Sequence, residues 1–373
     1  MENTTNVLTN NTGSPTCAVA KPLTAYEKWA SVAFYIFIIL FDLVGNSLVI
    51  IIVQRNQRMK NATNYLIVNM SVTEILSTLI NLNMSMAAFI IYPDYPPYVN
   101  DIFALILCKT LAFMDGLTHS LSTLSLTVIA FDRFFAVKYP LKRIITRGRA
   151  KKIIALIWLL SCIASSPLLY ASSYENKNQR LSCPRKWGPF PVNSYLIYVV
   201  THLVLFYIIP LAVMGVLYSV TVYKLWSRRI PGNVTAANQR VEQHAKTNVL
   251  KMCITVVVVF ALCWLPLFLT HVILESKVLE CGVQPAVYSA IVFLAHTYYA
   301  INPYIYFAFS KDYRRGLRHI FRPLIDMCGS KQDRDYLRRS HVMDMSVSPR
   351  TDLTESGIEV ISFRSLGTKD IIC

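Results

Sequence analysis

The sequence predicts an all-α membrane protein with seven transmembrane helices, an amphipathic eighth helix and disordered termini. The chain has 373 residues, of which 54% are hydrophobic and only 16% are charged. Its apolar residues fall into seven runs of roughly 20 residues or more, the length that crosses a bilayer. We expect the spans at about 29–53, 63–92, 104–137, 150–171, 194–226, 245–275 and 285–309, together forming one domain over residues 29–309.

Residues 1–28 precede the first span and are polar. They contain Asn-x-Thr sequons at Asn3 and Asn10, whose glycosylation requires an extracellular N-terminus. The segment has no apolar stretch followed by a cleavage site, so we expect no signal peptide. The first span is then expected to act as its own insertion signal.

The distribution of basic residues predicts the orientation. The net charge is +16, but lysine and arginine cluster beside the spans, which favours membrane orientation over nucleic-acid binding. Basic clusters follow the first and third spans and flank the fifth and sixth, whereas the loop after the second span has Asp94 and Asp101 without a basic residue. The positive-inside rule therefore predicts a plasma-membrane protein with an extracellular N-terminus and a cytoplasmic C-terminus.

The loop at 172–193 is an exception to this rule. It carries Lys177, Arg180, Arg185 and Lys186, although it is predicted to face outward. Basic residues at this position could serve a ligand or the membrane surface.

The segment after the seventh span predicts an amphipathic helix at 310–323. Tyr313, Leu317, Ile320 and Phe321 share one side of it, as in a helix that lies on the inner leaflet. Cys328 just beyond is a candidate for palmitoylation. Residues 324–373 are polar and are expected to form a disordered cytoplasmic tail.

The third span combines three chemically distinct positions. From Cys108 to Arg133 a helix rises about 37 Å, enough to cross the hydrocarbon core of about 30 Å. Asp115 lies about two turns inside Cys108, and His119 one turn further. An ionisable group at this depth is costly, so Asp115 should face the bundle interior or a watery cavity.

Six of the spans carry short motifs that occur in a fixed order. They are Gly45-Asn46, Asp132-Arg133-Phe134, Trp158, Pro210 with Tyr218, Phe260 with Cys263-Trp264-Leu265-Pro266, and Asn302-Pro303-Tyr304-Ile305-Tyr306. In this register the motifs resemble those of the rhodopsin-like (class A) G-protein-coupled receptors. Within that family the chain looks most similar to neuropeptide receptors.

The resemblance implies a receptor without enzymatic activity or cofactor, activated by an extracellular ligand and coupled to a heterotrimeric G protein. Prolines in the spans remove backbone donors, so the sixth span can bend outward and open an inner cleft around Arg133, Pro140 and Leu141. The activation switch implied by the family comprises Asp132, Arg133, Phe134, Tyr218, Phe260, Trp264, Pro266, Asn302, Pro303 and Tyr306. Receptor kinases and arrestin would act on Ser346, Ser348, Thr351, Thr354 and Ser356 in the tail.

Two positions depart from the family pattern. Glu74 stands where the second span usually has Asp, and Tyr298 and Tyr299 replace small polar residues, so a sodium site of Glu74, Ser122 and Asn302 competes with a protonated, hydrogen-bonded Glu74. Lys246 occupies the inner end of the sixth span, where an acid would form an ionic lock with Arg133. The missing acid predicts raised basal activity.

The cysteines suggest one or two extracellular bridges. The resemblance implies a disulfide between Cys108 and Cys183. Cys17 and Cys281 are also expected outside, where they would form a second bridge or remain free thiols.

The ligand class follows from residues around Asp115. Monoamine receptors place an ammonium-binding Asp there, but receptors similar to the opioid and somatostatin group do so too and bind peptides. This chain has His202 and Phe206 where amine receptors carry serines, and His296 at the position of the opsin lysine excludes retinal. A peptide ligand is favoured, and an amine that uses Asp115 as its ammonium anchor is the alternative. The predicted pocket comprises Asp115, His119, His202, Leu267, Phe268, His271, Tyr288 and His296.

The four histidines of this pocket permit two interpretations. They could line the pocket as hydrogen-bonding groups, or they could sense protons or Zn²⁺. Asp115 and His119 do not indicate an enzyme, because no Ser or Cys nucleophile motif accompanies them. The chain also shows no internal repeat of the kind found in transporters.

Overall fold

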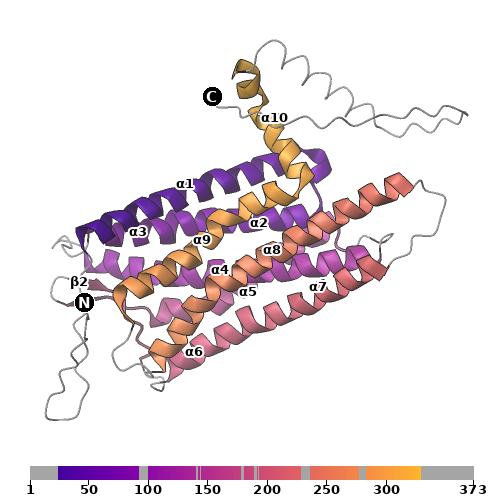
Figure 1. The fold of residues 1–373 in the computed structure, drawn as a ribbon. Coiled ribbons are helices and arrows are strands. Elements are labelled where there is room, and N and C mark those ends of the chain that lie inside the picture. The colour runs from indigo at the N-terminus through magenta and orange to yellow at the C-terminus, as the bar shows by residue number, and fades with distance from the viewer. Residues whose placement is uncertain are drawn as a thin grey trace, which may run out of the picture. The chain divides into compact units, whose positions relative to one another are not determined.

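The computed structural model describes residues 24–91, 100–139, 142, 144–177, 180–188, 191, 193–227, 236–276 and 283–328. The chain divides after Arg314 into two compact units, and the first contains the predicted membrane spans. In this unit the long helices run side by side (Figure 1). The helices and π-helical segments of the spans are α1 (Ala25–Arg55), α2 (Ala62–Ser77), η2 (Thr78–Leu82), α3 (Asn83–Ile91), α4 (Asp101–Lys138), α5 (Arg147–Ala171), α6 (Ser194–Leu203), η3 (Val204–Ile208), α7 (Ile209–Ser227), α8 (Ala236–Glu275) and α9 (Pro285–Phe309).

The fold confirms the predicted all-α class, although the seventh predicted span is more polar than the other six. Six described helical segments are long and apolar enough to cross a membrane. α9, with 25 residues, is not among them because it contains five tyrosines, His296 and Asn302. Tyr298, Tyr299 and Asn302 are buried in the bundle, so neighbouring helices shield these polar groups from lipid.

The sixth span agrees with its prediction, and one other predicted boundary was wrong. The candidate span Thr247–Glu275 matches the predicted 245–275, and the helix α8 itself begins earlier, at Ala236, since Ala236 to Lys246 includes good helix formers although it is polar. The surface helix α10 (Lys311–Cys328) extends beyond the predicted 323, so the first residues of the predicted disordered tail are helical. The residue that follows α10 in the sequence is Gly329, and glycine is the residue type most common just after a helix.

The ends of α1 and α10 are held by specific contacts. The Thr24 hydroxyl accepts from the backbone of Glu27, and the Glu27 carboxylate accepts from the backbone of Thr24, which completes a capping box before the apolar run begins. In the first turn of α10, Tyr313 packs on Tyr306 and donates to the Asn64 amide oxygen at 3.4 Å. Burial raises the pKa of the Tyr313 phenol, so it stays neutral.

Two of the spans contain π-helical turns. η3 ends two residues before Pro210 in the fifth span, and the proline lacks the N–H that a regular α-helix would bond back into this turn. η2 interrupts the second span at Thr78, whose hydroxyl donates to the Asp42 carboxylate of α1 at 2.7 Å.

Asn69 connects α2 to two other helices. It accepts from the Trp158 indole of α5 at 2.8 Å and donates to the Ser125 hydroxyl of α4 at 3.1 Å.

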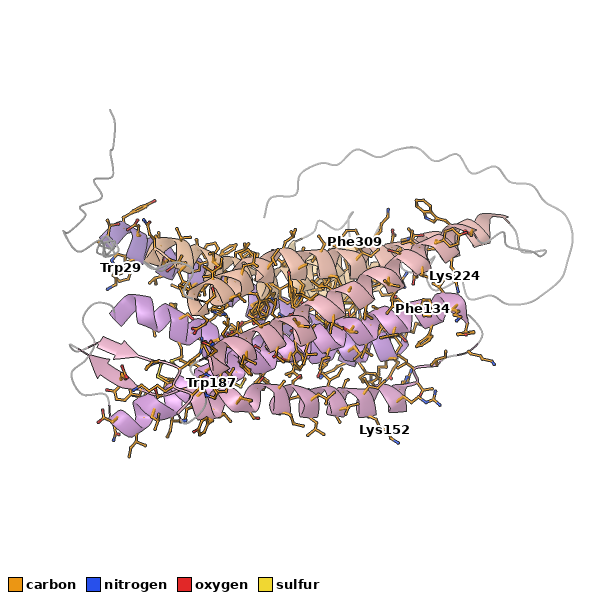
Figure 2. All side chains as sticks on the ribbon, turned by 90° about the horizontal axis from the view of Figure 1, so that it is seen from below. Trp29, Phe134, Lys152, Trp187, Lys224 and Phe309 are labelled. Carbon is orange, nitrogen blue, oxygen red and sulfur yellow. A yellow bond between two sulfur atoms is a disulfide. The ribbon has the colours of Figure 1, made fainter. Side chains whose placement is uncertain are left out.

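A short β-hairpin was not predicted. Strands β1 (Glu175–Lys177) and β2 (Arg180–Ser182) pair antiparallel, with Glu175 opposite Ser182. Glu175 also forms an ion pair with Lys186. Figure 2 shows Trp187 of this loop and Trp29 toward one end of the bundle, with Lys152 and Lys224 toward the other.

Gly45 sets the distance between α1 and α9. A Cβ at this position would lie 2.9 Å from both Cβ and Cγ of Pro303 and 3.3 Å from the Tyr304 ring. The glycine therefore permits a close helix contact that any side chain would open.

We predict that Gly45→Ala destabilises the bundle by about 1–3 kcal/mol, the usual cost of overpacking. The midpoint of thermal unfolding in detergent, followed by thiol-reactive or intrinsic fluorescence, should fall. Gly148→Ala is the matched control, because a Cβ there meets nothing within 4 Å. Equal midpoints for the two variants would contradict the close contact.

Candidate functional site

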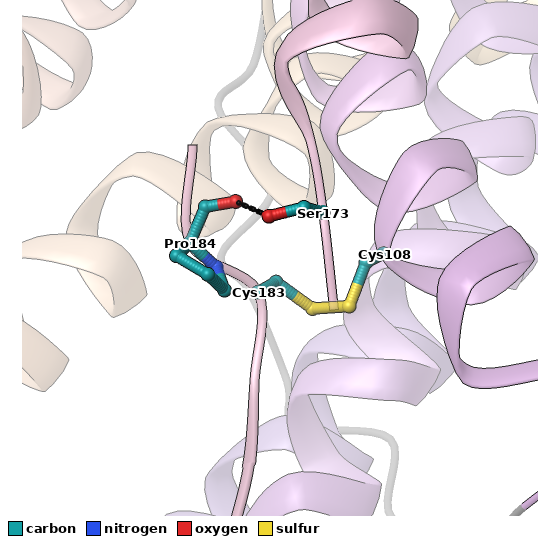
Figure 3. Close-up of a disulfide and its surroundings, with 4 residues drawn as sticks. All are labelled: Cys108, Ser173, Cys183 and Pro184. Atoms are coloured by element: carbon teal, nitrogen blue, oxygen red, sulfur yellow. Dashed lines mark hydrogen bonds between the residues drawn. A yellow bond between two sulfur atoms is a disulfide. The ribbon is translucent and has the colours of Figure 1, made fainter. Parts of the chain in front are cut away.

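α4 is the helix on which the functional side chains are arranged. It contacts α2, α5, α7 and α8, and its N-terminus is capped by the Asn100 side chain, which accepts from the backbone of Ile102 at 2.9 Å. The predicted disulfide between Cys108 and Cys183 is confirmed, with Cα atoms 5.4 Å apart (Figure 3). The backbone and hydroxyl of Ser173 both donate to the Pro184 carbonyl, at 3.0 and 3.1 Å, and hold the loop beside this bond.

A cavity of about 60 Å³ lies between this loop and the helices. Pockets that enclose whole small ligands are roughly 300–1,000 Å³, so only one end or one side chain of a ligand would enter here. Residues from α4, α5, the loop, α6 and α8 line it: Asp115, Gly116, His119, Leu168, Arg185, Tyr195, Tyr198, Val199, His202, Trp264, Leu267, Phe268 and His271.

The cavity carries opposite charges on two of its walls. The Asp115 carboxylate on α4 makes no hydrogen bond or ion pair with the residues that the structure describes. The Arg185 guanidinium, on the loop, donates to the Tyr195 hydroxyl and lies 5.0 Å from the centre of its ring. The Asp115 carboxylate is half-buried and lines the cavity, so it is available to a cationic or hydrogen-bond-donating ligand group.

His119 lies beneath Asp115 in a box of aromatic rings. Its ring centre is 4.6 Å from Trp264, 4.8 Å from Phe268, 5.4 Å from Phe260 and 5.6 Å from His202. A group that displaces His119 would therefore press directly on Trp264 and Phe260, two predicted switch residues.

The histidines do not assemble a metal centre in the described residues. No group of three or more His, Cys, Asp or Glu side chains is placed there to hold a metal ion. The His202 ring nitrogen lies 3.2 Å from the Ser120 hydroxyl, consistent with a hydrogen-bonding role. The proton-sensing interpretation remains a prediction.

Six of the eight predicted pocket residues line the cavity, and two do not. Tyr288 is 37% exposed on the outer part of α9. His296 is buried, with its ring centre 6.0 Å from Tyr35 and 6.2 Å from Tyr299. The orientation of α9 about its own axis turns His296 toward Tyr35 of α1. The position of a residue in a sequence motif does not predict this orientation.

Several lining residues were missed by the sequence reasoning. Tyr195, Tyr198, Val199 and His202 are spaced i, i+3, i+4 and i+7 on α6, so helical periodicity around His202 could have found them. Arg185 belongs to the basic loop that opposed the positive-inside rule. Gly116 and Leu168 had no comparable signal.

A second polar cluster lies deeper in the bundle. The Asn302 amide donates a hydrogen bond to the Glu74 carboxylate, so two residues of the predicted sodium site are in contact. Asp42 on α1, which the sequence reasoning missed, is fully buried and accepts from Asn46 at 2.8 Å and from Thr78 at 2.7 Å.

The sodium site and the protonated Glu74 both remain predictions. Glu74 Oε2, Ser122 Oγ and Asn302 Oδ1 are each buried without a hydrogen-bond partner in the described chain. These oxygens are ligands of the kind that hard cations prefer. A proton on Glu74 Oε2 would also relieve one of them.

The inner end of α4 holds a three-residue lock. The Arg133 guanidinium pairs with Asp132 at 2.5 Å and donates to the Thr63 hydroxyl, which itself donates to Asp132 at 2.5 Å. This lock opens onto a cavity of about 610 Å³ lined by residues of α2, α4 and α5 and by the segment between α4 and α5. Tyr218, predicted to meet Arg133 in the active form, has no hydrogen-bond partner in the described chain.

Several predicted sites lie outside the described residues. They are Asn3, Asn10, Cys17, Pro140, Leu141, Cys281 and the tail sites Ser346, Ser348, Thr351, Thr354 and Ser356. For Lys246 and Cys328 the structure describes the backbone of α8 and α10 but no side-chain surroundings.

A helical bundle with an outer cavity and an inner cavity, joined by one helix, is the arrangement expected of a transmembrane receptor. A model of the seven-transmembrane receptor (rhodopsin family) matches residues 45–306. The chain belongs to the rhodopsin family, a class of receptors and not of enzymes.

Several receptors from animals are similar to most of the chain. The Substance-P receptor of Homo sapiens is 33% identical over 321 residues, covering 84% of this chain and 75% of the relative. The Substance-P receptor of Aquarana catesbeiana is 33% identical over 293 residues, covering 77% and 69%. The Tachykinin-like peptides receptor 86C of Drosophila melanogaster is 32% identical over 321 residues, covering 82% and 62%.

Proposed function

We propose that the chain is a plasma-membrane receptor for an extracellular peptide and signals through a heterotrimeric G protein. The observation that carries this proposal is the unpaired Asp115 carboxylate in a cavity that contacts Trp264 through His119. The relatives support it, because they are receptors for substance P and for tachykinin-like peptides.

The cavity favours a peptide over a small amine. Its volume of about 60 Å³ admits one end of a ligand, while the hairpin of β1 and β2 lies in the same loop as the lining residue Arg185 and offers further backbone for contact. At the positions where amine receptors carry serines, His202 and Phe206 pack ring to ring at 4.8 Å. Asp115 would meet a cationic or donor group of the peptide, and Arg185 an acceptor.

The orientation rests on chemistry at the two ends of the bundle. The Cys108–Cys183 bridge belongs to an oxidising compartment, which favours an extracellular loop. Lys152 and Lys224 lie toward the opposite end (Figure 2), as the positive-inside rule requires of the cytoplasmic side. We therefore place the N-terminus outside and the tail, with its sites for receptor kinases and arrestin, in the cytoplasm.

Activation would be a population shift between two conformers. A peptide group that reaches Asp115 displaces His119 and with it Trp264 and Phe260. α8 then bends at Pro266, Arg133 leaves Asp132 and Thr63, and a cleft for the G protein opens beside Arg133. A peptide library that fails to stimulate nucleotide exchange in membranes containing the chain, while an amine panel succeeds, would overturn the peptide assignment.

We predict that Asp115→Asn lowers the potency of an active library peptide by roughly 10- to 100-fold, because a charge-assisted hydrogen bond is lost. Concentration–response curves of a second-messenger reporter measure this at matched surface expression. Asp101→Asn is the control, since Asp101 is an exposed acid in the first turn of the same helix. Unchanged potency of Asp115→Asn would remove Asp115 as the anchor.

Thr63→Val is predicted to raise ligand-free nucleotide exchange by roughly tenfold. The valine keeps the shape but removes the hydroxyl that bridges Asp132 and Arg133, a hydrogen bond to charged groups worth about 1.5 kcal/mol or more. Thr63→Ser keeps the hydroxyl and should match the unmodified receptor. If both variants behave like the unmodified chain, Thr63 does not hold the resting state.

A further inference from the structure

The helix α8 has a point at Pro266 where it bends easily. The proline has no N–H to donate to the Leu262 carbonyl one turn earlier, so the backbone of α8 is weaker there. The Thr270 hydroxyl donates to the Pro266 carbonyl at 2.7 Å, and hydrogen bonds of this kind often bend helices. The part of α8 that would swing outward in the proposed activation therefore lies on the inner side of Pro266.

Tyr207 connects this inner part of α8 to the fifth span. It belongs to η3, the π-helical turn between α6 and α7, and its side chain is 5% exposed. Its hydroxyl donates to the backbone carbonyl of Ala261 on α8 at 2.6 Å. Ala261 lies five residues, or about 7.5 Å of helix, on the inner side of Pro266. The hydrogen bond thus joins η3 to the segment of α8 that moves when the helix bends.

The ring of Tyr207 packs on α8 on both sides of the bend. Its centre is 6.0 Å from the ring of Phe260, on the inner side of Pro266, and 5.2 Å from the ring of Phe268, on the outer side. Ring pairs stay in contact up to about 7 Å, whereas a shift of about 1 Å ends a hydrogen bond of this length. The hydroxyl is therefore the part of Tyr207 that responds most sharply to bending.

The straight and the bent conformers of α8 differ in how this phenol is satisfied. In the straight conformer the hydroxyl has its carbonyl acceptor at a buried position. When the inner part of α8 swings out, the Ala261 carbonyl moves away and the hydroxyl loses this acceptor. A buried hydroxyl without a partner is costly, whereas a phenylalanine carries no such cost in either conformer. The hydrogen bond thus interacts differently with the two conformers, as a population shift requires.

We propose that Tyr207 is a positioning residue that holds α8 in its resting conformation through the Ala261 carbonyl. The lock of Arg133, Asp132 and Thr63 joins α4 to α2, so it does not restrain α8 itself. The restraint on the hinge concerns the conformation of the chain alone, and only its effect on the G protein rests on the proposed function.

Distance measurements on the purified full chain test the hinge without a G protein. Spin labels attached through bio-orthogonal side chains at Lys152 of α5 and Lys251 of α8, both exposed, report the separation of the inner ends. Double electron–electron resonance in ligand-free nanodiscs resolves a short and a long distance for the two conformers. Tyr207→Phe should raise the ratio of long to short distances by roughly 2- to 10-fold, the factor expected for one lost hydrogen bond.

Tyr304→Phe is the matched control. Its hydroxyl donates to the Phe41 carbonyl at 3.2 Å, so this variant loses the same kind of hydrogen bond between α9 and α1 and none to α8. Both variants should lower the midpoint of thermal unfolding, and only Tyr207→Phe should populate the long distance. The same change of distances in both variants, or no change in Tyr207→Phe, would overturn the proposal.

A donor restored at position 207 separates the hydrogen bond from the packing of the ring. Tyr207→4-aminophenylalanine keeps an N–H donor at the place of the hydroxyl, so its distances should return to those of the unmodified chain. Distances that instead match those of Tyr207→Phe would show that the hydrogen bond does not hold the hinge.

Nucleotide exchange tests the consequence for signalling. Ligand-free exchange should rise in Tyr207→Phe by the same factor as the population with the long distance, and it should stay at the unmodified level in Tyr304→Phe. Unchanged exchange together with a larger long-distance population would overturn the effect on signalling and support the restraint on the hinge. A chain that stimulates no G protein would overturn the proposed function, while the distances would still decide the role of Tyr207.

Discussion

The bilayer interior offers no water, so the protein itself must satisfy its backbone polar groups and shield its polar side chains from lipid, and this constraint shapes the whole bundle. α9 shows it most directly, because with five tyrosines, His296 and Asn302 it is too polar to face lipid on all sides. It crosses the membrane only because α1 and α8 pack against it and bury Tyr298, Tyr299 and Asn302. The polar face of α9 meets the polar side chains of α2, as in the Asn302–Glu74 hydrogen bond. The apolar helices are thus the condition under which a polar helix can exist in lipid.

The same constraint explains how the two ends of the receptor are connected. α4 has a disulfide at its outer end, Asp115 and His119 in the outer cavity, and Arg133 in the inner lock. The ring of His119 packs against three rings of α8, with ring centres 4.6 to 5.4 Å apart, so a displacement of His119 must also move rings of α8. At the inner end Arg133 is held by Asp132 and by the Thr63 hydroxyl of α2. The rings around His119 and the Asp132–Arg133 ion pair are the contacts on which the predicted switch would depend.

Hydropathy predicts the spans well because burying about 20 apolar residues in lipid outweighs local preferences. Motif register also predicted the Cys108–Cys183 bridge and six of the cavity residues. It could not predict how far each helix is rotated about its axis, so His296 and Tyr288 were assigned to a cavity they do not line. Rotation depends on close contacts such as Gly45 against Pro303, which only the folded bundle defines. Asp42 could have been found from the sequence, because a lone acid in an apolar run predicts a buried functional group, as it does for Asp115.

Three carboxylates in the described part of the bundle, the buried Asp42 and Glu74 and the half-buried Asp115, differ in their hydrogen bonds. Asp42 accepts on both oxygens, from Asn46 and Thr78, so its needs are met inside the protein. Glu74 accepts on one oxygen, and its other oxygen has no partner in the described chain, as suits a group that holds a proton or a cation. Asp115 makes neither a hydrogen bond nor an ion pair with the described residues, although it lines a cavity with Arg185 on the opposite wall. The number of carboxylate oxygens without a partner in the described chain thus rises from Asp42 to Glu74 to Asp115. Asp115 is therefore the acid with the most hydrogen-bonding capacity left for a ligand group, and the same helix carries Arg133 near its inner end.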